Sequence, residues 1–191
     1  ELVKKFLFFI FLFQTSLFAQ DLEKVYFAGG CFWCMEESFE KVDGVISVIS
    51  GYSGGRTKNP TYKEVTYGDT GHIETIEVKY DPKKTNFKKL LDIFWVNIDP
   101  FDAAGQFCDK GYSYRSAIFY NSQKEKKIIE KSINEIEKDL EKEVVTFVKK
   151  FDKFYIAESF HQDYYKEKFL NYLIYKKNCG RVETLNKIWN R

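Results

Sequence analysis

From residue 25 onward, apolar residues follow two spacings that predict strands and helices in turn. Val25–Ala28 is a short apolar run ended by Gly29 and Gly30, which is typical of a strand and the turn after it. A helical stripe follows at spacings of three, four and three, which predicts a helix that starts at Cys31. That stripe consists of Phe32, Met35, Phe39 and Val42. Residues 45–50 then predict a second strand.

The middle of the chain repeats this order. Strict alternation over residues 74–80 predicts a strand. One face of that strand carries Glu74, Ile76, Val78 and Tyr80. Apolar residues at i, i+3, i+4 and i+7 predict a helix over 87–94. An irregular segment over 99–113 leads to a strand over 114–120.

The C-terminal third is predicted as a charged helix over 124–143, a strand over 144–148 and a final helix that Ser159 caps. The resulting order is β-α-β, then β-α-β, then β-α. It predicts an α+β fold, a ferredoxin-like two-layer α/β sandwich with a mixed sheet and a long C-terminal extension. Because no repeat or linker interrupts the pattern, one domain over 20–191 is expected.

The first twenty residues do not fit this fold. Lys4 and Lys5 precede eight consecutive apolar residues, Phe6–Phe13, and Ala19 offers a small residue for cleavage. This layout predicts a signal peptide over 1–19 and an exported protein, periplasmic or otherwise outside the cytoplasm. The apolar run is shorter than the roughly 20 residues that span a bilayer. An uncleaved membrane anchor is the alternative.

Composition narrows the function classes. The net charge is +2, with 30 basic and 28 acidic residues, so the chain lacks the charge excess of a nucleic-acid binder. A 44% hydrophobic and 30% charged chain is globular. Aromatic residues make up 18%, enough for an aromatic core or an aromatic-lined site. Export would place the four cysteines in an oxidising compartment, where disulfides persist.

Cys31 and Cys34 form a C-x-x-C pair at the predicted helix start. The unpaired N–H groups and the dipole of a helix N-terminus favour a thiolate, which lowers a cysteine pKa. Glu36 and Glu37 oppose this effect, because their charges repel a nearby thiolate. The spacing is that of thiol–disulfide exchange. A structural disulfide and half of a zinc site are the alternatives.

Glu74 begins a strand on that strand's apolar face. A carboxyl that faces a core is desolvated, so its pKa rises and it can serve as a neutral acid near pH 7. The alternative is an exposed residue at a strand end. His72 and His161 are the only histidines, and each is expected to be a structural hydrogen-bonding residue.

Several motifs, in order, resemble the A-type peptide methionine sulfoxide reductases from about Val25 to the C-terminus. The motifs are GGCFWCMEESFEKVDGVISVISGYSGGRTKNPTY, GDTGHIE, FWVNIDPFDAAGQFCDKGYSYRSAIFY and ESFHQDYY. The resemblance implies reduction of the S epimer of methionine sulfoxide, recycling by thioredoxin and no bound cofactor. It assigns the nucleophile to Cys31, the catalytic acid to Glu74, and the substrate-methyl pocket to Phe32 and Trp33. The oxygen-binding residues fall on Tyr62, Asp109 and Tyr114.

The chemistry agrees with this resemblance. Attack on the sulfoxide sulfur requires a thiolate, and the departing oxygen requires a proton. Aromatic rings suit a methyl–sulfur group. The nucleophile is left as a sulfenic acid, which a second thiol must resolve.

The resemblance does not assign the resolving cysteine, because many relatives carry Gly where this chain has Cys34. We expect Cys34 to resolve the sulfenic acid, since closing a short loop costs less conformational entropy than fixing a distant tail. Cys108, Cys179 and a relay from Cys34 to Cys179 are the alternatives.

Two other functions would share some of these features. A cell-envelope thiol–disulfide oxidoreductase would share the C-x-x-C pair and the export, but it would not need Phe32 and Trp33 between the cysteines. A zinc-stapled or disulfide-stapled binding module fits less well, because only one pair of the four cysteines is closely spaced. No metal is therefore expected.

Overall fold

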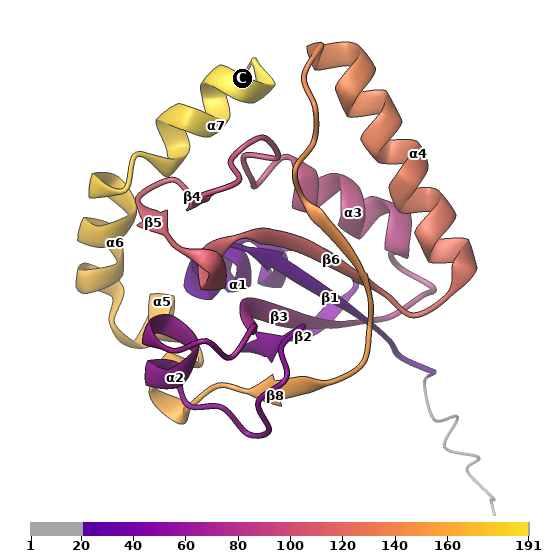
Figure 1. The fold of residues 1–191 in the computed structure, drawn as a ribbon. Coiled ribbons are helices and arrows are strands. Elements are labelled where there is room, and N and C mark those ends of the chain that lie inside the picture. Colours follow the sequence, from indigo (N-terminus) through magenta and orange to yellow (C-terminus); the bar gives the residue numbers. More distant parts are fainter. Residues whose placement is uncertain (1–20, 191) are drawn as a thin grey trace, which may run out of the picture.

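The computed structural model describes residues 21–190, so the predicted signal peptide lies outside the described residues. Six strands form one sheet in the order β7-β6-β1-β3-β2-β8 (Figure 1). These strands are β1 (Glu23–Gly29), β2 (Val45–Ser53), β3 (Ile73–Tyr80), β6 (Ser116–Tyr120), β7 (Phe147–Lys150) and β8 (Phe154–Ile156). Only β6 and β7 pair in parallel, so the sheet is mixed, as predicted.

Helices cover one face of this sheet. The first four are α1 (Phe32–Glu40), α2 (Tyr62–Tyr67), α3 (Phe87–Trp95) and α4 (Gln123–Leu140). The main core lies between the sheet and α1, α3 and α4. Phe27 of β1 shows the packing, because its ring stacks on Phe39 of α1 and Phe94 of α3 at centroid distances of 5.4 and 5.0 Å. This packing confirms the predicted two-layer α+β architecture.

The opposite face of the sheet is covered by a non-helical segment rather than by helices. Tyr26 and Phe119 point to this side, as the alternation of each strand requires. The segment that follows α4 runs across the sheet to β8 (Figure 1) and brings Phe151 onto Tyr26, with ring centroids 3.9 Å apart. β1 therefore lies in the centre of the molecule, and its C-terminal end carries the turn that leads to Cys31.

The strand predicted over 144–148 begins three residues later than predicted, at Phe147, and ends at Lys150. Helix α4 ends at Leu140 because Glu141 adopts a left-handed conformation, with φ of 51°. The amide of Val144 then bonds to the Glu137 carboxylate and that of Val145 to the Pro100 carbonyl, so neither is available to the sheet. Pairing with β6 begins only at Phe147.

The prediction of one final helix was wrong. Four pieces replace it: a 3₁₀ turn, η2 (Ser159–His161), then α5 (Tyr164–Glu167), α6 (Phe169–Asn178) and α7 (Arg181–Trp189). Asp163 and Gly180 have positive φ values of 53° and 68°, and each breaks the helical path. These pieces cross α1 and reach the end of β1, so the extension belongs to the wall of the site described below.

The segment 99–113 is also more ordered than predicted. It contains a two-stranded hairpin, β4 (Gly105–Gln106) and β5 (Asp109–Lys110), followed by the 3₁₀ turn η1 (Tyr112–Tyr114). Within residues 21–190, no helix is both long and apolar enough to cross a membrane.

Candidate active site

Cys31 sits where β1 turns into α1. Gly30 makes the turn possible, since its φ is +78° and a Cβ there would lie 2.5 Å from Gln106 Cβ. The carbonyl of Cys31 accepts the first helical hydrogen bonds from the amides of Cys34 (3.2 Å) and Met35 (3.4 Å). Cys31 is therefore the N-cap of α1, at the helix start that the sequence predicted. Cys34 lies one turn further along.

Both thiols are free, and both are buried, with 5% and 3% of their surface exposed. They hydrogen-bond to each other. Burial and the bond to Cys34 raise the pKa of Cys31 well above its usual range. The bond from Cys31, with the positive charges of Arg181 and Lys176, lowers the pKa of Cys34 to about 6. Burial therefore opposes the pKa lowering that the helix N-terminus was expected to produce at Cys31, whereas the neighbouring positive charges favour ionisation of Cys34.

Glu74 faces Cys31 from β3 and is 2% exposed. Its Oε2 accepts a 3.0 Å hydrogen bond from the amide of Phe32, the first residue of α1. Burial raises the pKa of Glu74 well above its usual range, although the Phe32 bond opposes the shift. Burial thus favours the protonated carboxyl, and the alternative of an exposed strand end is wrong. A proton donor stands beside the thiol pair.

The remaining acidic residues affect the pair less than expected. Burial raises the pKa of Glu36 to about 7, so its charge is weakened. Burial of Glu37 is outweighed by hydrogen bonds from Lys176, Lys41 and Tyr172, which hold its pKa at about 2. Because its charge is matched by two lysines, the expected repulsion of a thiolate is largely cancelled.

A small pocket of about 120 Å³ opens on Cys31. The structure brings all seven residues predicted for the nucleophile, acid, oxygen and methyl sites to this pocket and adds an eighth. The lining residues are Cys31, Phe32, Trp33, Tyr62, Glu74, Asp109, Tyr114 and Tyr175. The hydroxyls of Tyr62 and Tyr114 lie 3.3 Å apart, so two phenols can meet one small polar atom. A larger cavity of about 620 Å³ near the start of α4 contains no thiol and no member of this set.

Local sequence also explains how Tyr62 is placed. Thr61 and Glu64 form a capping box at the start of α2, because each side chain bonds the other's backbone amide, at 3.3 and 2.8 Å. The amide of Tyr62 donates to Glu158 Oε1 at 2.8 Å. Together these bonds turn the Tyr62 ring toward Glu74 and Tyr114.

Sequence reasoning missed Tyr175, which α6 brings into the pocket. Its hydroxyl donates to the Asp109 carboxylate, and its ring meets Trp33 edge-on at 6.0 Å. The same hydroxyl partly opposes the rise in the pKa of Cys31. No pattern around residue 175 could have singled it out among thirteen tyrosines.

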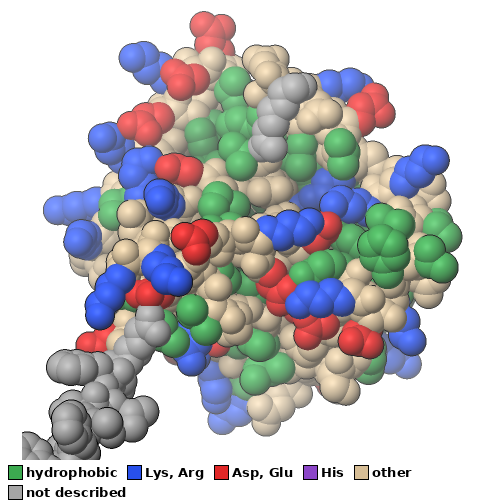
Figure 2. All heavy atoms as spheres, turned by 180° about the vertical axis from the view of Figure 1, so that it is seen from behind, with side chains coloured by type: hydrophobic (Ala, Val, Ile, Leu, Met, Phe, Trp, Pro, Cys, Tyr) green, Lys and Arg blue, Asp and Glu red, His purple; other side chains and the backbone are tan. Residues whose placement is uncertain are grey.

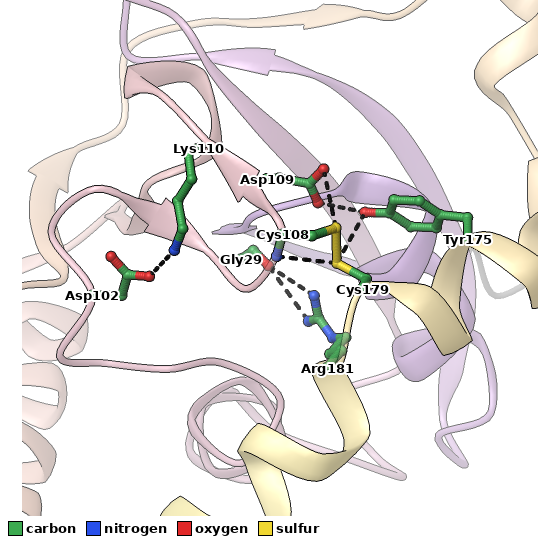
Figure 3. The surroundings of a disulfide bond; sticks show 8 residues. All are labelled: Gly29, Asp102, Cys108, Asp109, Lys110, Tyr175, Cys179 and Arg181. Atoms are coloured by element: carbon green, nitrogen blue, oxygen red, sulfur yellow. Dashed lines mark hydrogen bonds and ion pairs between the residues drawn. A yellow bond between two sulfur atoms is a disulfide. The ribbon is translucent and has the colours of Figure 1, made fainter.

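A disulfide joins Cys108 to Cys179, with Cα atoms 4.8 Å apart, and ties the β4–β5 hairpin to the end of α6 (Figure 3). The Cys108 amide donates to Cys179 Sγ at 3.2 Å. Tyr175 lies one turn before Cys179, and Asp109 follows Cys108. The disulfide and the Tyr175–Asp109 hydrogen bond thus close one ring beside the pocket. The Cys108–Cys179 disulfide leaves Cys31 and Cys34 as the free thiols of the described residues.

Arg181 was also missed. Its guanidinium is 4% exposed and donates to the carbonyls of Gly29 and Asn97 and to the sulfur of Met35 (Figure 3 shows the bond to Gly29). A buried guanidinium in this position fastens α7 to the turn before Cys31. It also places a positive charge near Cys34.

The two histidines differ. His72 fits the structural expectation, because its ring bonds the Gly55 amide and the Thr57 carbonyl. Neither ring nitrogen of His161 has a hydrogen-bond partner among the described residues. His161 packs against Phe32 and Tyr62 at centroid distances of 5.0 and 4.5 Å, so it supports the pocket wall by contact.

The described residues offer few groups that could bind a metal ion. Two groups of described residues are close enough to share an ion: Cys108, Asp109 and Cys179, and Glu36, Glu40 and Asp163. In the first group the disulfide occupies both sulfurs. Neither group includes the C-x-x-C pair, so the zinc alternative has no support from it.

The family model described as peptide methionine sulfoxide reductase matches residues 23–191. This chain belongs to that family. Its relatives include the peptide methionine sulfoxide reductase MsrA of Listeria monocytogenes serotype 4b, 46% identical over 172 residues that cover 89% of this chain and 97% of the relative. The MsrA of Bacillus licheniformis is 43% identical over 91% of this chain and 97% of its own length.

Solved structures agree with this assignment. Methionine sulfoxide reductase A of Corynebacterium diphtheriae has a TM-score of 0.72 and 31% identity, over 78% of this chain and 76% of that one. Reduced Mxr1 of Saccharomyces cerevisiae has the same TM-score and 30% identity, over 76% and 85%. The A-type reductase predicted from the motifs is therefore confirmed, and with it the thiol-dependent reduction of methionine sulfoxide. The envelope oxidoreductase and the binding module are set aside.

Proposed function

We propose that this reductase acts on the S epimer of methionine sulfoxide, free or in oxidised proteins, with Cys31 as the nucleophile and Glu74 as the acid. The observation that carries this proposal is the pocket in which the Cys31 thiol faces a buried carboxyl whose raised pKa favours its protonated form. Phe32 and Trp33 receive the substrate methyl group. The hydroxyls of Tyr62 and Tyr114, with Asp109, hold the sulfoxide oxygen.

The first step is oxygen transfer. Cys31 passes its proton to Cys34 and attacks the sulfoxide sulfur as a thiolate. Glu74 protonates the oxygen as the S–O bond of the substrate breaks. The released hydroxide attacks Cys31 Sγ and breaks the bond between Cys31 and the substrate sulfur, so methionine leaves, Cys31 becomes a sulfenic acid, and Glu74 becomes a carboxylate. One proton and one oxygen atom are thereby accounted for.

The second step resolves the sulfenic acid. The thiol of Cys34 attacks Cys31 Sγ, water leaves, and a Cys31–Cys34 disulfide forms. Their positions one helical turn apart and their mutual hydrogen bond support Cys34 for this role. A dithiol of the thioredoxin type then reduces the disulfide, so the cycle needs no bound cofactor.

The partner surface is proposed to include α6. Four large apolar side chains are exposed on this helix next to the site, and Figure 2 shows hydrophobic side chains gathered there. They are Phe169, Leu170, Leu173 and Ile174, between 44% and 71% exposed. A patch of this kind is suited to contact with another protein.

Export is proposed on the pattern of residues 1–19 alone. The mature protein would then comprise one catalytic domain over 20–191 without stable membrane association. N-terminal sequencing of the protein from its native host is the test, and the expected N-terminus lies at or near Gln20. A full-length species as the main cellular form would overturn the proposal.

The central test is a single turnover of the fully reduced protein with one equivalent of methionine-S-sulfoxide. The unmodified protein should release one methionine per chain, and Cys31→Ser should release none. The matched control is Cys108→Ser with Cys179→Ser, which should retain the burst. Methionine formation by Cys31→Ser above background would remove Cys31 from the role of nucleophile.

A further inference from the structure

The two thiols of the C-x-x-C pair open on different cavities. The substrate pocket described above is lined by Cys31 and not by Cys34. A second cavity of about 170 Å³ is lined by Cys34 and not by Cys31. Its walls come from α1, α6 and α7 and from Asn97 after α3. Cys34 thus forms the boundary between the interior pair and a space that the substrate does not enter.

The position of the second cavity matters for disulfide reduction. A thiolate attacks a disulfide sulfur roughly in line with the S–S bond, from the side opposite the leaving sulfur. In a Cys31–Cys34 disulfide, attack on Cys34 therefore comes from the side away from Cys31. A cavity that is lined by Cys34 and not by Cys31 leads to Cys34 without passing through the substrate pocket. The substrate pocket, by contrast, leads to Cys31 and is narrowed by Trp33 and Tyr175.

The cavity also has the charge that such a reaction needs. Arg181 and Lys176 both line it. The hydrogen-bond acceptors of Arg181 are two carbonyls and a thioether, all neutral, so its positive charge acts on any anion that enters. Lys176 is shared with the Glu37 carboxylate. Exposed Val182 and Asn186 of α7 form an outer wall that a substitution can change.

We propose that this second cavity is the entry site for the thiolate of the reductant, which attacks Cys34 there and expels Cys31 as a thiolate. The proposal rests on the proposed function, in which Cys34 resolves the sulfenic acid. The new bond joins the reductant sulfur to Cys34, and the Cys31–Cys34 bond breaks. A second thiol of the reductant then attacks the mixed disulfide, which oxidises the reductant and returns Cys34. Substrate and reductant therefore use opposite sides of one pair.

The first test locates the mixed disulfide. The protein is oxidised with one equivalent of methionine-S-sulfoxide, treated briefly with 3-mercaptopropionate, quenched with acid and mapped by mass spectrometry. The adduct is expected on Cys34. An adduct on Cys31 overturns the entry site but leaves the proposed function intact. Release of methionine without a Cys31–Cys34 disulfide overturns Cys34 as the resolving thiol, and the entry site with it.

The second test uses charge. Rates of reduction of the Cys31–Cys34 disulfide are compared for 3-mercaptopropionate and cysteamine, each expressed per thiolate present. The anionic thiol is expected to react about threefold faster or more, because the cavity is cationic. Lys176→Gln should reduce this preference. Equal rates, or a preference for cysteamine, overturn the entry site.

The third test blocks the cavity. Val182→Trp with Asn186→Trp places two rings on its outer wall, and Lys187→Trp, on the same helix but outside the cavity, is the matched control. The ratio of the recycling rate to the first-turnover rate is measured with dithiothreitol and with a thioredoxin. A decrease of about tenfold or more in the double variant with both reductants, or with dithiothreitol alone, supports the entry site. A decrease with thioredoxin alone, which indicates lost protein docking, or with neither reductant, overturns it.

Discussion

The two cysteine pairs of this reductase are built in opposite ways. Cys31 and Cys34 lie in one helical turn, are buried, and remain free thiols. Cys108 and Cys179 are 71 residues apart, and their disulfide joins a hairpin to a helix end at the protein surface. The position of Cys31 and Cys34 is thus set by local sequence, and their pKa values are shifted by neighbouring residues. Cys108 and Cys179 instead join two distant segments of the chain.

This difference shows how four cysteines can serve two purposes. Closing a short loop restricts the chain little, so the near pair can change oxidation state without a large change in fold stability. Closing a long loop restricts the unfolded chain strongly, so the far pair stabilises the fold. Tyr175 and Asp109 connect the two, since each is close in sequence to one cysteine of the far pair and lines the pocket of the near pair.

The largest effect after loss of Cys31 is expected at Glu74, which serves the near pair only. Glu74→Gln should lower kcat/KM for methionine sulfoxide by about 10²–10⁴-fold, because a positioned acid is lost. The unmodified enzyme needs Glu74 protonated, so its activity should fall as pH rises through the raised pKa of this group. It also needs the pair to be ionised, which adds a loss of activity below about pH 6.

The check is a pH–rate profile of both proteins. In the glutamine variant the alkaline loss should disappear while the acid loss near pH 6 remains. The Cys108–Cys179 disulfide should be unchanged on mass mapping. A full-sized alkaline loss in Glu74→Gln would assign the proton to another group.

The next largest effect is expected for Cys34→Ser, which distinguishes the roles of the two cysteine pairs. The first turnover should still occur, but the sulfenic acid of Cys31 should accumulate, and steady-state turnover with thioredoxin should fall by about tenfold or more. Dimedone labelling followed by mass spectrometry measures the accumulation. Thioredoxin is required in the turnover assay, because a small thiol attacks the sulfenic acid directly. Normal turnover of Cys34→Ser, together with arrest of Cys179→Ser, would show that the far pair resolves.

Removal of the far pair should act mainly on stability. Cys108→Ser with Cys179→Ser should lower the free energy of unfolding by about 2–4 kcal/mol, which is about 5–10 °C in Tm for a chain of this size. Thermal unfolding followed by circular dichroism measures the loss. Unmodified protein treated with a reductant is the control, and it should lose a similar amount. No change in Tm would show that the disulfide does not constrain the fold.

The smallest effect is expected at Tyr175, where the two pairs meet. Tyr175→Phe removes the hydroxyl that donates to Asp109 and that lowers the pKa of Cys31, so kcat/KM should fall by about threefold to tenfold, which is the effect of losing about one hydrogen bond. In the Cys108→Ser, Cys179→Ser background the same change should cost less, because α6 no longer holds the ring in place. Equal losses in both backgrounds would show that the disulfide does not position Tyr175.

Much of this structure could be predicted from local pattern. The strand and helix around Cys31 follow from apolar spacing, and the burial of Glu74 follows from alternation in β3. The resemblance then placed Tyr62, Asp109 and Tyr114 around them. These features depend on periodicity or on quoted motifs, both of which a single sequence contains.

The rest depends on contacts between distant segments. The pairing of Cys108 with Cys179 cannot be deduced from four cysteines, because several pairings fit equally. Asp163 and Gly180 break the C-terminal helix by positive φ values that the aromatic pattern hid. The burial of Arg181 had no signal, since arginine usually marks a surface. The positive charge that this arginine places beside Cys34, which helps to lower the pKa of that thiol, had no signal either.

The contact between Arg181 and the Gly29 carbonyl has a consequence for biosynthesis. The two residues are 152 positions apart. Cys31 and Cys34 of a nascent chain therefore leave the ribosome long before the Arg181 guanidinium, whose charge lowers the pKa of Cys34. Until α6 and α7 have been translated, the thiols lack their cationic neighbours, and the pocket lacks Tyr175. Redox reactivity is therefore acquired late in synthesis, and a chain interrupted before residue 181 keeps both cysteines without the electrostatic environment that makes them a reactive pair.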